Sequence, residues 1–180
     1  MRRLFFRRTA FPGRPDGLGR PSYSCIAMRR RWAVCLLLAF LSGCGRRPPY
    51  AGRSVAELQA MLDDPSPTVQ AQAAYGLSLH HAKARPALPA LTRTLRSPDA
   101  LVRQQSALAL GEIGAEAEEA VPALIEALHD AEWSVRRQAA LALGQIGPPA
   151  RAAEKELVHC QRDHNSLVRK AAGQALAKIK

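Results

Sequence analysis

Residues 102–114 read Val-Arg-Gln-Gln-Ser-Ala-Leu-Ala-Leu-Gly-Glu-Ile-Gly, and residues 135–147 read Val-Arg-Arg-Gln-Ala-Ala-Leu-Ala-Leu-Gly-Gln-Ile-Gly. The same spacing of 33 residues (102 − 69, 135 − 102 and 168 − 135) separates Val69, Val102, Val135 and Val168. A fixed period of about 20–50 residues is typical of a solenoid, in which one supersecondary unit stacks on copies of itself. The period therefore predicts an all-α fold, an α-solenoid of about four helical hairpins over residues 54–180.

Each period divides into two helices. In the first, apolar residues recur at helical spacing, as at Leu88, Leu91 and Leu95. The second begins just before the recurring valine. One amphipathic hairpin cannot bury its own apolar face, whereas a stack of hairpins can.

Capping residues define where these helices begin and end. The residues five positions before the valines are all of types favoured at helix N-caps: Asp64, Ser97, Asp130 and Asp163. Pro65 and Pro98 follow two of them, and proline is favoured at the first helical position. Gly114 and Gly147 are predicted to end two of the second helices in a left-handed conformation.

The N-terminal region reads as an export signal. Met28-Arg29-Arg30-Arg31 is a positive segment, and residues 32–41 are apolar but too short to span a bilayer, which needs about 20 residues. Leu41-Ser42-Gly43-Cys44 resembles the lipobox of bacterial lipoproteins, which implies cleavage before Cys44 and lipidation of its thiol. We expect residues 28–43 to be a lipoprotein signal peptide, residues 44–53 a tether, and residues 1–27 a non-native or disordered extension.

The charge of the chain is concentrated in this region. Residues 1–43 hold nine Arg and one Asp, a net charge of +8, whereas residues 44–180 hold 17 Lys and Arg against 14 Asp and Glu, a net charge of +3. The near balance after Cys44 and the scarcity of aromatic residues there argue against nucleic-acid binding. Only Cys160 remains as a cysteine after Cys44, so no disulfide framework is expected.

Residues 98–114 resemble a HEAT repeat of the type named after phycobilisome lyases. The resemblance covers residues 54–180 and implies that the second helices line the concave surface of the solenoid. It leaves two functions open. One is a scaffold or adaptor, held by lipid on the extracytoplasmic side of the cell or outer membrane, that binds an envelope-associated protein without cofactor, metal or small-molecule substrate. The alternative is a cytoplasmic enzyme, a bilin lyase or lyase-accessory protein.

Polar residues that recur on the second helices are the candidate contacts with a protein partner: Gln105, Glu112, Arg137, Gln138 and Gln145. The alternative is an ordinary solvated helix face. Trp133 interrupts the period and is either a binding anchor or a residue that packs on the preceding turn.

Two further groups of residues are candidate sites. Arg103, Arg136 and Arg169 recur with the period, and pairing with Asp130 and Asp163 is favoured over an anion-binding stripe. His159, Cys160, Asp163 and His164 lie close in sequence, but a predicted helix break interrupts them, so no metal site is assigned. No constellation typical of catalysis is present, and a fold alone supplies no reaction.

Overall fold

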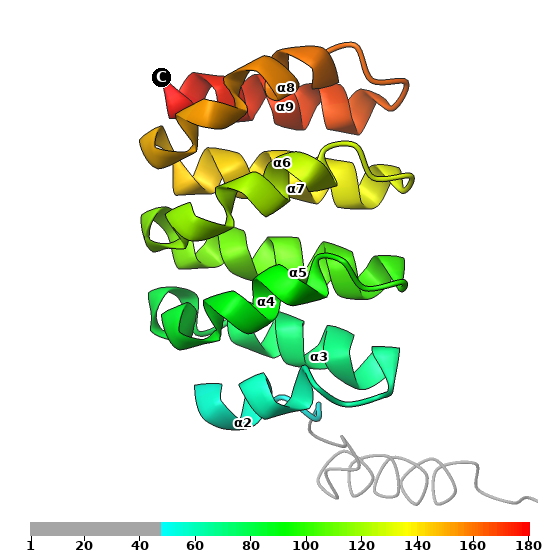
Figure 1. Ribbon diagram of the computed structural model, residues 1–180, viewed down its shortest axis with the longest axis vertical. Helices are drawn as coiled ribbons and strands as arrows, with labels where there is room; N and C mark the ends of the chain where they lie inside the picture. The colour runs from blue at the N-terminus through cyan, green and yellow to red at the C-terminus, as the bar shows by residue number, and fades with distance from the viewer. Residues whose placement is uncertain (1–47) are drawn as a thin grey trace, which may run out of the picture. The chain divides into compact units, whose positions relative to one another are not determined.

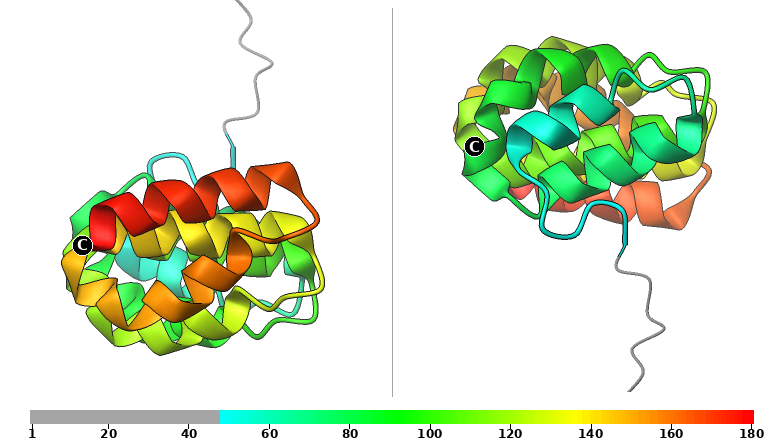
Figure 2. Two further views of the ribbon diagram at one scale, coloured as in Figure 1. Left: turned by 90° about the horizontal axis from the view of Figure 1, so that it is seen from above. Right: turned by 90° about the horizontal axis from the view of Figure 1, so that it is seen from below.

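The computed structural model describes residues 48–180, and these residues form a two-layer stack of helices (Figures 1 and 2). One layer holds the short helices α2 (Val55–Met61), α4 (Leu88–Thr94), α6 (Val121–Ala127) and α8 (Glu154–Cys160). The other holds the long helices α3 (Pro67–Ser78), α5 (Ala100–Ile113), α7 (Trp133–Ile146) and α9 (Ser166–Ile179). The predicted all-α solenoid of four helical hairpins is confirmed.

Three 3-10 segments precede the later short helices, and the sequence pattern did not predict them. They are η1 (His81–Ala87), η2 (Gly114–Ala120) and η3 (Pro148–Ala153). Each buries two alanines completely, as Ala117 and Ala120 do in η2. Small side chains let these tight turns lie against the core without displacing the leucines around them.

The core repeats with the same period as the sequence. Leu58, Leu91, Leu124 and Leu157 of the short helices are fully buried, one from each hairpin. Small residues bring neighbouring long helices close together. A methyl group built on Gly144 of α7 would lie 2.9 Å from Ala175 Cα of α9, so no side chain larger than hydrogen fits there without movement.

The predicted N-caps are wrong by two residues. The N-cap positions of the long helices are held by Ser66, Asp99, Glu132 and Asn165, three residues before each valine. Of these four, Asp99 and Asn165 accept hydrogen bonds from backbone N–H groups of the first turn. Asp163 lies in the loop instead, where its carboxylate accepts a hydrogen bond from the backbone N–H of Asn165 at 2.7 Å. Such a side-chain turn competes with helix capping for the same residue types, which explains the error.

The predicted positions of two prolines and two glycines differ in detail from the structure. Pro65 and Pro98 lie in the loops, and Pro67 is the first residue of α3. Gly114 and Gly147 do end α5 and α7 with positive φ, but their ψ angles of −145° and −140° lie outside the left-handed helical region. That combination of angles is essentially restricted to glycine.

Residues 48–53 are the described part of the predicted tether, and they fold against the first repeat. Ala51 N–H donates to the Pro48 carbonyl at 2.8 Å, and the ring of Tyr50 packs edge-to-face against Tyr75 with centroids 5.1 Å apart. No helix within residues 48–180 is long and apolar enough to cross a bilayer. The expected extension, signal peptide and Cys44 lie outside the described residues.

Candidate protein-binding surface

The outward side of α3, α5, α7 and α9 forms one continuous surface, which we call the long-helix face. It consists of the residues at positions −1, +2, +3, +6 and +10 relative to each recurring valine, a spacing that places side chains on one side of a helix. Because the four helices lie side by side in the order α3, α5, α7, α9, equivalent positions form rows that cross the stack (Figures 1 and 2).

The first two repeats give the long-helix face an apolar hollow. A cavity of about 200 Å³ is lined by residues of α3 and α5 and by Tyr50: Thr68, Ala71, Gln72, Tyr75, Leu101 and Gln105. Leu101 is 52% exposed and Tyr75 is 37% exposed, and both line the same hollow. Exposed apolar side chains around a hollow are typical of interaction sites.

Gln105 lines this hollow and has one buried polar atom without a hydrogen-bond partner. Its Oε1 is the one buried side-chain nitrogen or oxygen among residues 48–180 without a hydrogen-bond partner. A buried acceptor without a donor costs about 1–3 kcal/mol. Gln105 was predicted as a contact residue, and the structure places it at the hollow, next to Gln72 of the preceding repeat.

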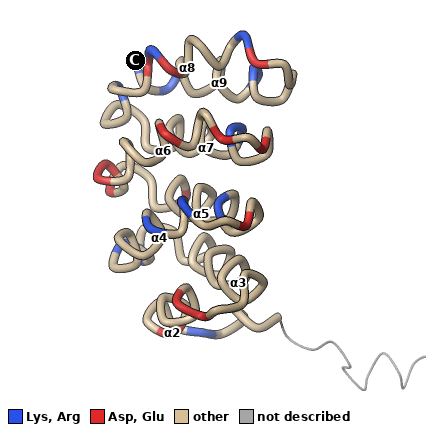
Figure 3. The backbone as a smooth tube through the Cα atoms, turned by 45° about the vertical axis from the view of Figure 1, so that its right-hand side comes forward, with Lys and Arg blue, Asp and Glu red and all other residues tan. Residues whose placement is uncertain are grey.

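Charge is distributed unevenly over the long helices. They carry six basic residues (Arg103, Arg136, Arg137, Arg169, Lys170 and Lys178) and one acidic residue, Glu112. α3 carries none, and its tube is tan throughout in Figure 3. On the long-helix face, the basic residues Arg137, Lys170 and Lys178 therefore belong to the third and fourth repeats only.

The other predicted contact residues differ in how much they offer a partner. Arg137 is half-buried, and Gln138 is only 8% exposed. Glu112 and Gln145 are occupied with each other, because Gln145 Nε2 donates to Glu112 Oε1 at 2.9 Å. His81 Nδ1 lies 3.0 Å from the other oxygen of Glu112, so this carboxylate joins two repeats.

Trp133 is the first residue of α7 and is 42% exposed. Trp133 stands two residues before Val135, outside the long-helix face, and the other predicted residues are spread over that face rather than gathered at one point. Tyr50, Tyr75, Leu101 and Lys170 were not predicted as contacts. The available signal for Leu101 was a large apolar residue directly before a recurring valine, where the periodic pattern requires none.

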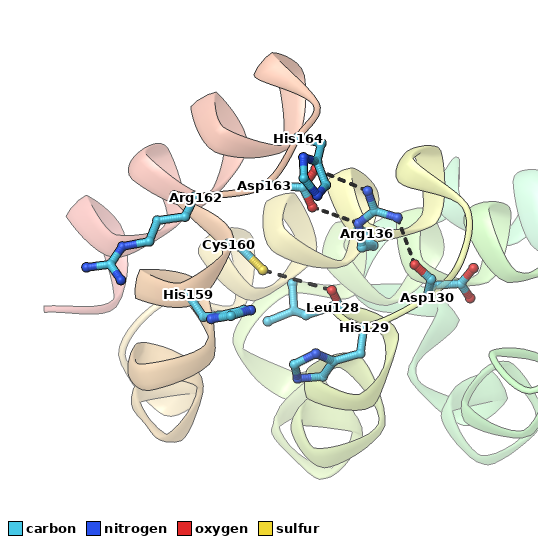
Figure 4. Close-up of a pocket in the computed structure, with 9 residues that line it drawn as sticks. All are labelled: Leu128, His129, Asp130, Arg136, His159, Cys160, Arg162, Asp163 and His164. Carbon is cyan, nitrogen blue, oxygen red and sulfur yellow. Dashed lines mark hydrogen bonds and ion pairs between the residues drawn. The ribbon is translucent and has the colours of Figure 1, made fainter.

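Arg103 and Arg136 pair with the aspartates, as favoured from the sequence, whereas within residues 48–180 Arg169 donates only to the carbonyls of Asp163 and His164. Arg103 Nε and Nη2 donate to the two carboxylate oxygens of Asp130 at 2.7 and 2.8 Å, across 27 residues. Arg136 makes the same fork to Asp163 at 2.8 and 3.1 Å. The other Arg136 nitrogen donates to the Asp130 and Ala131 carbonyls, so each of these two arginines holds its own loop and the next one (Figure 4).

These ion pairs shift the pKa of both carboxyl groups. The hydrogen bonds from Arg136 lower the pKa of Asp163, and partial burial opposes them only in part. Burial raises the pKa of Asp130, but the hydrogen bonds from Arg103 and from the Glu132 N–H outweigh it, so the net shift is downward. Both aspartates are therefore held in the ionised form that the arginine fork requires.

At the junction between the first two repeats, Gln70 and Ser97 stand in place of the arginine–aspartate ion pair. Gln70 occupies the position of the arginine, and Ser97 occupies that of the aspartate. Gln70 Nε2 still donates to the Asp64 carbonyl of its own loop at 2.8 Å. Charge is thus lost on both sides of this junction together, which avoids an unpaired buried ion.

A second cavity, of about 450 Å³, lies beside the last ion pair (Figure 4). It is lined by Leu128, His129, Asp130, Arg136, His159, Cys160, Arg162, Asp163 and His164. His159 lies beside His129 with ring centroids 6.3 Å apart, whereas Asp163 is engaged with Arg136. Burial raises the pKa of the Cys160 thiol. Within the described part of the chain, no three His, Cys, Asp or Glu side chains are placed to hold a metal ion.

Comparisons with known proteins identify the repeat. The family model described as HEAT repeats matches residues 55–131 and 121–180, well over half of the chain. Comparison with curated proteins returns no match.

Several solved structures are similar to this chain, including the following two. An engineered protein is 27% identical, with a TM-score of 0.59 over 71% of this chain and 62% of its own. A designed armadillo repeat protein in complex with peptide (KR)4 is 22% identical, with a TM-score of 0.62 over 70% of this chain and 64% of its own. The chain thus spans less than two thirds of the length of either. Repeat sequence, architecture and family match agree, and the chain belongs to the HEAT-repeat family.

Proposed function

We propose that the chain is a lipid-anchored HEAT-repeat scaffold that binds another protein through its long-helix face. The observation that carries the binding part is the hollow between α3 and α5. Leu101 and Tyr75 expose apolar surface there, and Gln105 keeps a polar atom without a partner. A protein partner that covered the hollow would remove the apolar surface from water and supply a donor to Gln105.

The designed armadillo relative adds support of a general kind. It is in complex with peptide (KR)4, so a helical repeat protein of similar fold can bind a peptide. The anchoring part rests on Leu41-Ser42-Gly43-Cys44 and the apolar segment before it. Two or more acyl chains on Cys44 would hold the protein stably at a membrane, because each buried methylene contributes about 0.8 kcal/mol.

The binding part is tested by co-purification from solubilised membranes of the native host. Leu101→Glu places a charge in the hollow, and we expect it to release the partner. Val158→Glu is the matched control, because Val158 is 47% exposed but lies on α8 in the layer of short helices. Retention of every partner by Leu101→Glu, or equal loss with Val158→Glu, would contradict binding at this face.

The anchoring part is tested by the intact mass of the protein from the membrane fraction, with Cys44→Ala beside the wild type. We expect a mature chain that begins at a lipidated Cys44, and its loss in the variant. A soluble, unmodified chain that retains residues before Cys44 would contradict the anchor. It would also restore the bilin lyase as the next function to test.

A further inference from the structure

We propose that the partner segment bound by the long-helix face is an extended acidic peptide with one apolar residue. The apolar residue would enter the hollow between α3 and α5, and its acidic residues would contact Arg137 and Lys170. The inference rests on the proposed function and adds the chemistry and spacing of the ligand.

The basic end of the face is free to bind an anion. Arg137, Lys170 and Lys178 take part in none of the ion pairs found within residues 48–180, in contrast to Arg103 and Arg136. The one acidic residue of the face, Glu112, already accepts hydrogen bonds at both of its oxygens. Uncompensated positive charge on one part of a surface favours a partner of opposite charge.

The apolar surface at the α3–α5 end of the same face favours a peptide over a simple polyanion as the ligand. No charged residue lies on α3, and the hollow is lined there by Tyr50, Tyr75 and Leu101. A nucleic acid or a lipid headgroup surface would bring negative charge along its whole length and leave this hollow unfilled. A peptide can place an apolar side chain at one end and carboxylates at the other.

The free Oε1 of Gln105 points to the same conclusion. A peptide backbone carries one N–H donor per residue, and a small rotation of the Gln105 side chain would bring the buried acceptor to a backbone lying over the hollow. A phosphate group would bring only acceptors and could not satisfy it. Peptide recognition by backbone hydrogen bonds plus side-chain pockets is a recurrent mode.

The distance between neighbouring long helices determines how far apart the contact residues lie along the peptide. Packed helices lie about 8–10 Å apart, so Arg137 on α7 lies about 14 Å from the α3–α5 hollow and Lys170 on α9 about 23 Å. An extended chain advances about 3.3 Å per residue. The acidic residues of the ligand should therefore lie about four and about seven residues from the apolar one.

The test is selection of random 12-residue peptides displayed on phage against the full chain, followed by fluorescence anisotropy with the selected peptides. We expect sequences with the apolar residue and acidic residues at about this spacing. Arg137→Glu/Lys170→Glu should weaken their binding at least tenfold, and added salt should weaken it further in the wild type. Lys155→Glu is the control, because Lys155 is an exposed lysine of α8 in the other layer.

Three results would overturn the inference. Selected peptides without acidic residues, released by Leu101→Glu but not by the double variant, would leave the proposed function intact and refute the charge preference. Equal loss of affinity in Lys155→Glu would show a general charge effect. Tighter binding of a 20-nucleotide single strand or of phosphatidylglycerol vesicles than of the selected peptides would replace the peptide with another polyanion.

Discussion

Gly144→Ala tests whether the close approach of α7 and α9 determines the stability of the stack. The added methyl carbon would lie 2.9 Å from Ala175 Cα and 3.1 Å from Ala175 Cβ. Carbon atoms pack best at about 3.5–4.0 Å, so the two helices must separate by about half an ångström or more. Overpacking of this kind costs about 1–3 kcal/mol, whereas replacing glycine by alanine within a helix gains only about 0.5–1 kcal/mol.

Gly173→Ala is the matched control on the neighbouring helix. A methyl group there would meet only Gln161 Nε2, at the ordinary distance of 3.8 Å, so only the helix-propensity gain remains. We expect Gly173→Ala to stabilise by about 0.5–1 kcal/mol and Gly144→Ala to fall about 1–3 kcal/mol below it. Urea unfolding followed by circular dichroism at 222 nm measures both midpoints. A Gly144→Ala chain as stable as Gly173→Ala would refute the close-approach argument.

Four more predictions concern the polar contacts. Asp163→Asn should destabilise by about 3 kcal/mol at pH 7, because it leaves the partly buried Arg136 without its carboxylate; thermal unfolding measures the loss. The folded-state pKa values of Asp130 and Asp163 lie below their unfolded values, so the stability that these carboxylates add is present near neutral pH and declines below about pH 5. Asp163→Asn should show a shallower decline of stability with falling pH. An unchanged pH profile in this variant would contradict the lowered pKa of Asp163. Arg136→Gln with Asp163→Ser reproduces the neutral Gln70–Ser97 junction and should cost less than the sum of the single changes in a double-mutant cycle. Gln105→Leu should stabilise by about 1 kcal/mol because it removes the unsatisfied acceptor, and a lower melting temperature would contradict this.

The fold could be predicted from the sequence because the period is carried by many residues at once. Val102 and Leu110 are buried, and so are their equivalents in the third and fourth repeats; in the first repeat Leu77 is buried and Val69 is half-buried. The residues that carry the sequence period are therefore largely the residues that pack in the core. The N-caps were misplaced because Asp, Ser and Asn are favoured both in loops and at N-caps. In this chain the loop residue and the true N-cap residue lie within three residues of each other.

The candidate surface was harder to predict from the sequence than the fold. Repetition identified Gln105 and Arg137, but it also selected Gln138, which is buried, and Gln145, which is bonded to Glu112. Tyr75 breaks the period and gives no periodic signal, and the leucine before the valine recurs at Leu101 and Leu167 without showing which of the two lines a hollow with Tyr75. The role of Tyr75 and Leu101 becomes visible only when two adjacent helices are seen to enclose one hollow.

The neutral junction between Gln70 and Ser97 has a consequence for the order in which the stack opens. A solenoid is a one-dimensional array in which each repeat is held mainly by its neighbours. The arginine forks join the second repeat to the third and the third to the fourth, whereas the first repeat meets the second without one. The first hairpin should therefore detach at lower cost than the others, and its amide hydrogens should exchange fastest. That hairpin also supplies Tyr75 to the hollow, so the surface that binds would belong in part to the segment that opens first.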